Sequence, residues 1–279
     1  MSAKNVFIPV EAAVGLTGFA AAGVIFVFSA AAQAGILDSR PAEEFLSADE
    51  VKNLIDRGSE VITEAVAAFE KLDKIDWEGC PQSQTVQPLG KDIVHILSEV
   101  IKNDISAVDL FLKMLKEGTF RERCGIMCVL IKEKTADTRL VPVLAGMIDA
   151  EKAVRMRAVY LLGIQDGEEA VTILRKALKT EKDIKIRQDA AAALAGRGDK
   201  KGIKVLENDL RSDDAHFRAE TAQRLGNIRR KEILPLLEKA IRKEKSSMVV
   251  AALVSSIRRH TGKTDDEVRQ EYIGMPLLK

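Results

Sequence analysis

The sequence predicts an all-α fold: an α-solenoid of stacked helical hairpins preceded by a single transmembrane helix. Two observations lead to this prediction. A block of about 31 residues recurs through the second half of the chain, and a period between about 20 and 50 residues is typical of solenoids and similar arrays. Residues 12–37 contain no charged side chain, and a helix of about 20 apolar residues can cross the hydrocarbon core of a bilayer.

The chain divides into five predicted parts. Residues 1–11 form an N-terminal tail, and residues 12–37 form the transmembrane helix or an uncleaved signal anchor. An acidic linker with N-terminal helices follows at 38–104, and the repeats occupy 105–263. Residues 264–279 are expected to form a capping segment, because the last unit of a repeat array needs a polar outer cover.

The predicted transmembrane helix carries small residues on roughly one face, at Gly15, Gly18, Ala22 and Ser29. Such faces allow close packing between membrane helices, so we expect contact with another membrane subunit. Two alternatives remain open. Residues 32–35 resemble the cleavage site of a secretory signal, although the apolar stretch exceeds the about 7–15 residues that such a signal has. The segment could instead be a helix buried in a protein partner.

Two helices are predicted between the anchor and the repeats. Ser47 and Glu50 have the spacing of a capping box, in which each side chain accepts a hydrogen bond from the other residue's backbone N–H. Apolar residues at helical spacing follow as far as Leu72 and predict one amphipathic helix of about 25 residues. Residues 77–88 are expected to form a loop, and a second helix is predicted at 89–102.

Each repeat contains an apolar stretch, a charged break and a second apolar stretch, which predicts a helical hairpin. The units 141–166, 171–199, 203–230 and 233–263 align on two independent sets of apolar residues. The first set is Leu144, Leu174, Leu206 and Leu237, and the second set is Leu162, Leu194, Leu225 and Ile257. Such a hairpin cannot bury its own apolar face, so neighbouring hairpins are expected to stack on a shared core.

The second helices also resemble a known repeat family. Residues 154–163, 186–194 and 217–226 follow a pattern close to V-R-x-x-A-x-x-A-L-G-x-x-G-D, with Asp166 and Asp199 near its closing aspartate. This pattern is similar to that of HEAT-like repeats, including the phycobilisome-lyase type. The resemblance covers about residues 105–263. It implies an α-solenoid and leaves the partner open, because one fold serves many functions.

The match departs from the family pattern in three places. Ala195 replaces a glycine, Val250 replaces the arginine of the last unit, and the first unit, 105–134, is degenerate. Degenerate units at the ends of an array are typical of capping repeats.

An arginine stands seven residues before the aligned leucine in three second helices, at Arg155, Arg187 and Arg218. This constant register suggests structural ion pairs between repeats. Asp189 and Glu220 are among the expected partners.

The charge of the chain is unevenly distributed, although its net value is only +1. Residues 38–118 carry a net charge of −8 and residues 151–263 a net charge of +10. Nucleic acid is disfavoured as a partner because aromatic residues are scarce and acidic residues interleave with basic ones. Most of these charges are expected on solvated helix faces. The densest basic cluster is the predicted partner-binding patch: Arg224, Arg229, Arg230, Lys231, Arg258 and Arg259.

Catalytic motifs are largely absent from the sequence. It contains no glycine-rich phosphate loop and no His-Glu-x-x-His, and its three histidines lack partners at ligand spacing. Cys124 and Cys128 are four residues apart and are expected to be buried, inert thiols. We therefore predict no catalytic, cofactor or metal site, and no enzymatic activity.

The predicted function is a membrane-anchored scaffold or accessory subunit that binds a protein partner, for example an integral membrane complex that handles electrons. The basic residues after the anchor favour a single-pass protein of the inner (plasma) membrane with a cytoplasmic repeat domain, and free thiols fit a reducing compartment. Two alternatives remain: a HEAT enzyme or chaperone resembling the bilin lyases, and an exported periplasmic binding module released at Ala34.

Overall fold

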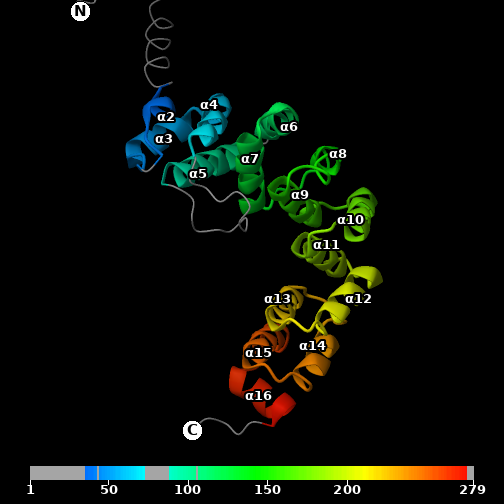
Figure 1. The fold of residues 1–279 in the computed structure, drawn as a ribbon. Coiled ribbons are helices and arrows are strands. Elements are labelled where there is room, and N and C mark those ends of the chain that lie inside the picture. Colours follow the sequence, from blue (N-terminus) through cyan, green and yellow to red (C-terminus); the bar gives the residue numbers. More distant parts are fainter. Residues whose placement is uncertain (1–34, 43, 73–87, 105, 275–279) are drawn as a thin grey trace, which may run out of the picture.

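The computed structural model describes residues 35–42, 44–72, 88–104 and 106–274, and every regular element within them is helical. The helices follow one another along a curved path that starts at α2 and ends at α16 (Figure 1). The architecture is therefore the all-α solenoid that the sequence predicts.

The helix predicted at 89–102 is confirmed as α5 (Pro88–Asn103), whereas the helix predicted before it is divided into shorter pieces. The helices before α5 are α2 (Ile36–Ser39), α3 (Ala48–Asp56), η2 (Gly58–Val61), α4 (Ile62–Ala67) and η3 (Ala68–Lys71). The Ser47–Glu50 capping box is confirmed at the start of α3. The single helix of about 25 residues is wrong, because α3 ends at Asp56 and Gly58 has φ +58, a left-handed conformation that ends helices.

Five consecutive hairpins and one closing helix make up the rest. The hairpins are α6 (Ala107–Glu117) with α7 (Phe120–Lys132), α8 (Leu140–Ala145) with α9 (Lys152–Ile164), α10 (Glu168–Thr180) with α11 (Ile184–Gly196), α12 (Lys200–Asp209) with α13 (Ala215–Gly226), and α14 (Leu234–Ile241) with α15 (Ser247–Thr261). The closing helix is α16 (Asp265–Ile273). The first helices lie on the outer side of the curve and the second helices on the inner side (Figure 1).

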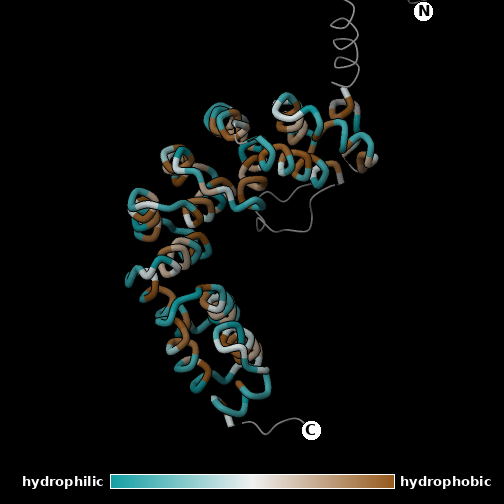
Figure 2. The backbone as a smooth tube through the Cα atoms, turned by 180° about the vertical axis from the view of Figure 1, so that it is seen from behind, coloured by the Kyte–Doolittle hydropathy of each residue, from teal (hydrophilic) through white to brown (hydrophobic). Residues whose placement is uncertain are grey.

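The two aligned sets of apolar residues are buried in the core. All eight residues have no exposed surface, which confirms the predicted repeat register. Polar and apolar residues alternate along the helices (Figure 2), so each hairpin presents an apolar side to its neighbours. Val268 and Tyr272 of α16 are buried against the end of the array.

The buried apolar residues form two cores. The first extends from Leu37 to Leu194 and the second from Ala191 to Tyr272, so the two meet at α11. Polar contacts join α11 to α13 at this boundary. Gln188 Nε2 donates to Thr221 Oγ1 at 2.6 Å, and Arg224 Nε donates to Asp189 Oδ1 at 3.0 Å.

Most of the predicted transmembrane helix lies outside the described residues. This includes residues 12–34, with Gly15, Gly18, Ala22 and Ser29. Among the helices that the structure does describe, none has both the length and the apolar character needed to span a bilayer.

The predicted C-terminal end of the transmembrane helix is corrected by the structure. Leu37 belongs to α2, is fully buried, and packs in the first core. The Nζ atom of Lys71 donates to the backbone carbonyl of Leu37 at 2.8 Å. Leu37 therefore contacts protein, so a membrane segment would have to end before α2.

Candidate protein-interaction grooves

Ion pairs join neighbouring repeats at a regular position. Arg155 Nε donates to Glu181 Oε2 at 2.9 Å, and the Nε and Nη2 atoms of Arg218 donate to the two oxygens of Glu244, each at 2.9 Å. Each glutamate stands 26 residues after its arginine, in the turn before the next inner helix. It also accepts a backbone N–H there, from Asp183 at 2.8 Å and from Ser246 at 2.9 Å.

Two of the three repeated arginines, Arg155 and Arg218, therefore form inter-repeat ion pairs as predicted, but with different partners; Arg187 forms none within the described residues. Asp189 is bound by Arg224, and Glu220 lies 3.6 Å from Lys185 and 3.7 Å from Arg224. The hydrogen bond from Arg218 lowers the pKa of Glu244. At Glu181, burial acts to raise the pKa, but the bond from Arg155 and the backbone bonds outweigh it, and the pKa is lowered.

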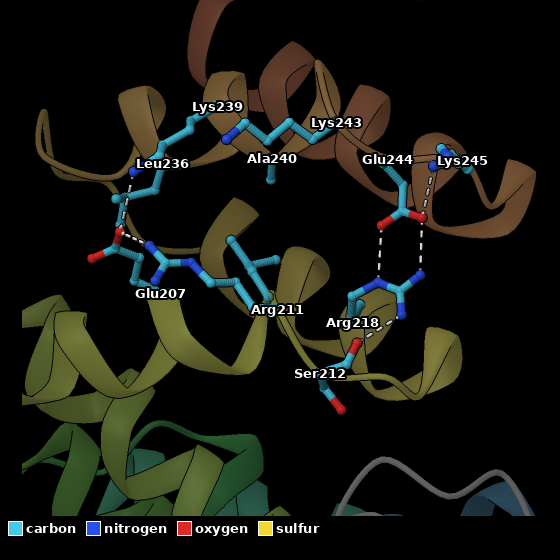
Figure 3. A pocket seen from close by; sticks show the side chains of 11 residues that line it. Glu207, Arg211, Ser212, Arg218, Leu236, Lys239, Ala240, Lys243, Glu244 and Lys245 are labelled. Carbon is cyan, nitrogen blue, oxygen red and sulfur yellow. Dashed lines mark hydrogen bonds and ion pairs between the residues drawn. The ribbon is translucent and has the colours of Figure 1, made fainter.

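An outer groove of about 520 Å³ lies between α12 and α14 (Figure 3). Its apolar residues are Leu210, Leu236 and Ala240, and its charged residues are Glu207, Arg211, Arg218, Lys239, Lys243, Glu244 and Lys245. Glu207 accepts a hydrogen bond from Arg211 and lies 3.6 Å from Lys239.

Two lysines of this groove are available to a partner. Lys243 and Lys245 form no ion pair with any residue in the described part of the chain. The groove thus combines an apolar surface with two uncompensated positive charges.

A second groove, of about 370 Å³, lies on the inner side between α13 and α15. Small residues such as Ala219 and Ala251 line it together with Met248, which is 38% exposed, and Arg259. A third groove, of about 600 Å³, lies on the outer side between α6, α7 and α8. Spaces of this size can hold a few side chains of a partner.

The predicted basic cluster does not form one uncompensated patch. Arg224 pairs with Asp189 at 3.0 Å, Arg230 lies 3.5 Å from Glu232, and Arg258 pairs with Asp265 at 3.0 Å. Each of these three arginines therefore has a carboxylate partner within the chain.

The other three residues of the cluster, Arg229, Lys231 and Arg259, differ in role. Arg229 donates to the backbone carbonyl of Arg259. The Nη1 atom of Arg259 donates to Asn227 Oδ1 at 3.0 Å, and Arg259 lines the inner groove. Lys231 is exposed.

Sequence reasoning missed the outer grooves, although one signal was available. Arg123 stands 32 residues before Arg155 and occupies the same position at the start of α7. An acidic residue also follows each of the four arginines after 26 positions: Asp149, Glu181, Asp213 and Glu244. An arginine and an acidic residue that recur together at a constant spacing of 26 residues indicate an ion pair between repeats. A local excess of basic residues does not indicate such a specific contact.

The two cysteines in the described part of the chain, Cys124 and Cys128, are buried or partly buried. Cys124 is fully buried, and burial raises its pKa to about 12; Cys128 is partly buried and also unpaired. Because the thiolate is the reactive form, Cys124 is unreactive near neutral pH. Within the described ranges, no group of three His, Cys, Asp or Glu side chains is placed to hold a metal ion.

A family model described as HEAT repeats matches residues 108–195 and 177–258. Together the two matches cover more than half of the chain. The match is to HEAT repeats in general and gives no support to the phycobilisome-lyase type in particular. No curated protein matches the sequence.

Proposed function

Because the chain belongs to the HEAT-repeat family, we propose that it is a scaffold that binds a partner protein in the groove between α12 and α14. Residues 12–34 tether this scaffold to a membrane. Helical repeat arrays expose long surfaces that commonly bind other proteins. The proposal assigns that role to one groove.

The observation that carries the proposal is the composition of the α12–α14 groove. An apolar side chain of the partner would be buried against Leu210, Leu236 and Ala240. Acidic residues beside it would meet Lys243 and Lys245, whose charges are not compensated within the described chain. Complementary charge favours rapid and specific association, so binding is expected to weaken as the salt concentration rises.

The membrane tether is supported by composition. Residues 12–34 contain no charged side chain, and a helix satisfies its backbone hydrogen bonds internally, as lipid requires. The basic residues that follow, such as Arg40, Lys52 and Arg57, favour a cytoplasmic position for the repeats. The proposed location is therefore the cytoplasmic side of the plasma membrane.

Site-specific photo-crosslinking tests the binding groove. A photoreactive amino acid in place of Lys239, on the rim, is expected to capture a defined protein in the native cells. The double charge reversal K243E/K245E should abolish the crosslink. The matched reversal K200E/K201E, at the start of α12, should leave it unchanged. Crosslinks that persist in K243E/K245E, or an identical pattern from a probe at Lys204, would exclude the groove.

Cell fractionation tests the tether independently. The full-length chain is expected in the membrane fraction and to resist extraction by high salt, whereas residues 35–279 should be released. Full-length protein in the supernatant would refute the tether without affecting the groove.

A further inference from the structure

The outer groove between α6, α7 and α8 follows the same plan as the α12–α14 groove, but no carboxylate of the described chain binds Arg123, which stands where Arg218 stands in the other groove. We propose that this groove binds an acidic segment of a partner protein through a salt bridge to Arg123. The site is distinct from the one proposed above and shares with it only that the occupant is a protein.

The two grooves correspond residue by residue. Leu130 of α7 and Leu225 of α13 are both fully buried, and each follows its groove arginine, Arg123 or Arg218, by seven positions. Near the end of the preceding outer helix, Leu115 and Lys116 of α6 take the place of Leu210 and Arg211, which directly follow α12.

The following outer helices correspond in the same way. Val143 of α8 and Met147, two residues after α8 ends, line one groove where Leu236 and Ala240 of α14 line the other. The α6–α8 groove is therefore a built feature of the repeat and not an accidental surface hollow.

The equivalent arginines in other repeats show which chemical group an arginine at this position binds. Two of the four repeated arginines are held by a glutamate side chain in the turn before the next inner helix: Arg218 by Glu244 and Arg155 by Glu181. A carboxylate and a guanidinium form two parallel hydrogen bonds, which selects for this partner over a neutral one.

Arg123 lacks this internal partner. The residue 26 positions later is Asp149, whose side chain is one methylene shorter, is 80% exposed, and lies 3.8 Å from Lys176. The Nε atom of Arg123 donates to the backbone carbonyl of Thr119 at 3.3 Å, and no carboxylate among the described residues lies within ion-pair distance. Arg123 is partly exposed and lines the groove, so a carboxylate from another chain can reach it.

The third repeat differs, because its arginine is enclosed. The Nε atom of Arg187 is buried, and the charge of Arg187 acts on the Asp209 carboxyl, where burial nevertheless raises the pKa. Arg187 therefore acts on a carboxyl of its own chain and lines neither of the two outer grooves. Of the four arginines in register, Arg123 alone offers its charge at a groove with no carboxylate on it, within the described chain.

The remaining charges of the α6–α8 groove define the occupant further. Arg139 is neutralised by Asp109 and Asp137, whereas Lys116 has no ion pair within the described residues. Leu112, which is partly buried, lines the groove beside these two cations together with the mostly buried Val143 and Met147, and Leu115 in the same lining is fully buried. The occupant is therefore a segment that places Glu or Asp next to a large apolar residue.

Fluorescence anisotropy with a labelled peptide tests the inference on the full-length protein in detergent. The probe is Gly-Ser-Leu-Glu-Glu-Leu-Ser-Gly, and its control carries Gln at both Glu positions. We expect the Glu peptide to bind and R123Q to weaken binding by about ten-fold or more, as expected for the loss of a charge-assisted pair. R123K should weaken it less, because lysine keeps the charge but loses the planar fork.

Matched variants separate this site from other sources of affinity. K132Q removes one exposed positive charge from the same helix and should leave binding unchanged, as should K243E/K245E in the other groove. The thermal unfolding midpoint of R123Q is measured in parallel, and R123K provides a folded comparison if that midpoint falls.

Several outcomes would overturn the inference. These are no binding of the Glu peptide by the wild-type protein, equal binding by folded R123Q, and equal affinity for the Gln peptide. Binding of inorganic phosphate or of vesicles containing phosphatidylserine that depends on Arg123, without peptide binding, would assign the groove to another anion. Because crosslinking at position 239 does not involve Arg123, failure here leaves the α12–α14 proposal standing, and the reverse also holds.

Discussion

At the scale of single residues, one arginine in each of two repeats determines how neighbouring hairpins are held. The glutamates that bind Arg155 and Arg218 also accept backbone N–H groups at the start of the next inner helix. Each glutamate therefore fixes both the position of the adjacent repeat and the beginning of its helix. A carboxylate with several charge-assisted donors is strongly favoured in its ionised form.

Replacing Glu244 with Gln tests this role. Glu244 is 10% exposed, and loss of its charged pair is expected to lower the free energy of unfolding by about 1–3 kcal/mol at pH 7. The pKa of Glu244 lies below its ordinary value of 4.5 in the folded protein. Its contribution is therefore complete above that value and is lost as the pH falls through the lowered folded pKa.

Urea unfolding of wild type and E244Q at several pH values measures this difference. The gap between them should narrow steadily below about pH 4.5. E207Q serves as the control, because the Glu207 pair with Arg211 is more exposed and exposed pairs contribute about 1 kcal/mol or less. A gap that does not change with pH would contradict the assigned ion pair.

At the scale of elements, close packing between helices explains why glycine occurs at a position where helix propensity alone would disfavour it. A Cβ atom on Gly125 would lie 2.3 Å from the ring of Phe69, so α7 and η3 can pack together only with glycine there. Gly196, at the end of α11, has open space around it. Close packing therefore requires glycine at position 125, whereas no packing contact requires it at position 196.

The substitution G125A is therefore expected to destabilise the protein by about 1–3 kcal/mol through overpacking. G196A should be neutral or stabilise it by up to about 1 kcal/mol, because alanine has the higher helix propensity. Chemical denaturation of both variants gives the comparison. Equal effects would mean that α7 does not pack on Phe69 as described.

The short helix α2 gives a second prediction at this scale. A chain of residues 38–279 lacks Leu37, which is fully buried, whereas a chain of residues 35–279 retains it. The shorter chain should be less stable by about 2–5 kcal/mol, the usual cost of deleting a buried leucine side chain. Equal unfolding midpoints for the two chains would show that α2 is not part of the core.

At the scale of the whole molecule, the array is divided into two apolar cores joined by a polar layer. Gln188, Thr221, Asp189 and Arg224 form this layer between α11 and α13. Repeat arrays are stabilised by each repeat and its nearest neighbours. Weaker apolar contact at one interface should therefore allow the two parts to open separately.

Native-state hydrogen exchange of L225A measures this separation. Leu225 is fully buried in the second core, so the variant should lose about 2–5 kcal/mol of stability. Amides of α13, α14 and α15 should lose protection while those of α7 and α9 keep theirs. The exposed-site variant K182A should change neither part, and uniform loss of protection in L225A would show that the array unfolds as one unit.

The sequence by itself determined the hairpins, their register and the eight buried apolar residues that define it, because helical periodicity and apolar spacing are local properties of the chain. It also contained the Ser47–Glu50 cap, which depends on neighbouring residues only. It did not reveal the break at Gly58, because glycine permits a left-handed turn without requiring one.

The tertiary structure decided which basic side chains have an acidic partner within the protein. Arg224, Arg230 and Arg258 belong to the densest basic cluster in the sequence, yet each has an acidic partner in the fold. Arg123 lies outside that cluster, and only the packing of α6, α7 and α8 places it at a groove without a carboxylate of the described chain. The physical reason is that an ion pair depends on distance in space, and composition along the chain does not contain that distance.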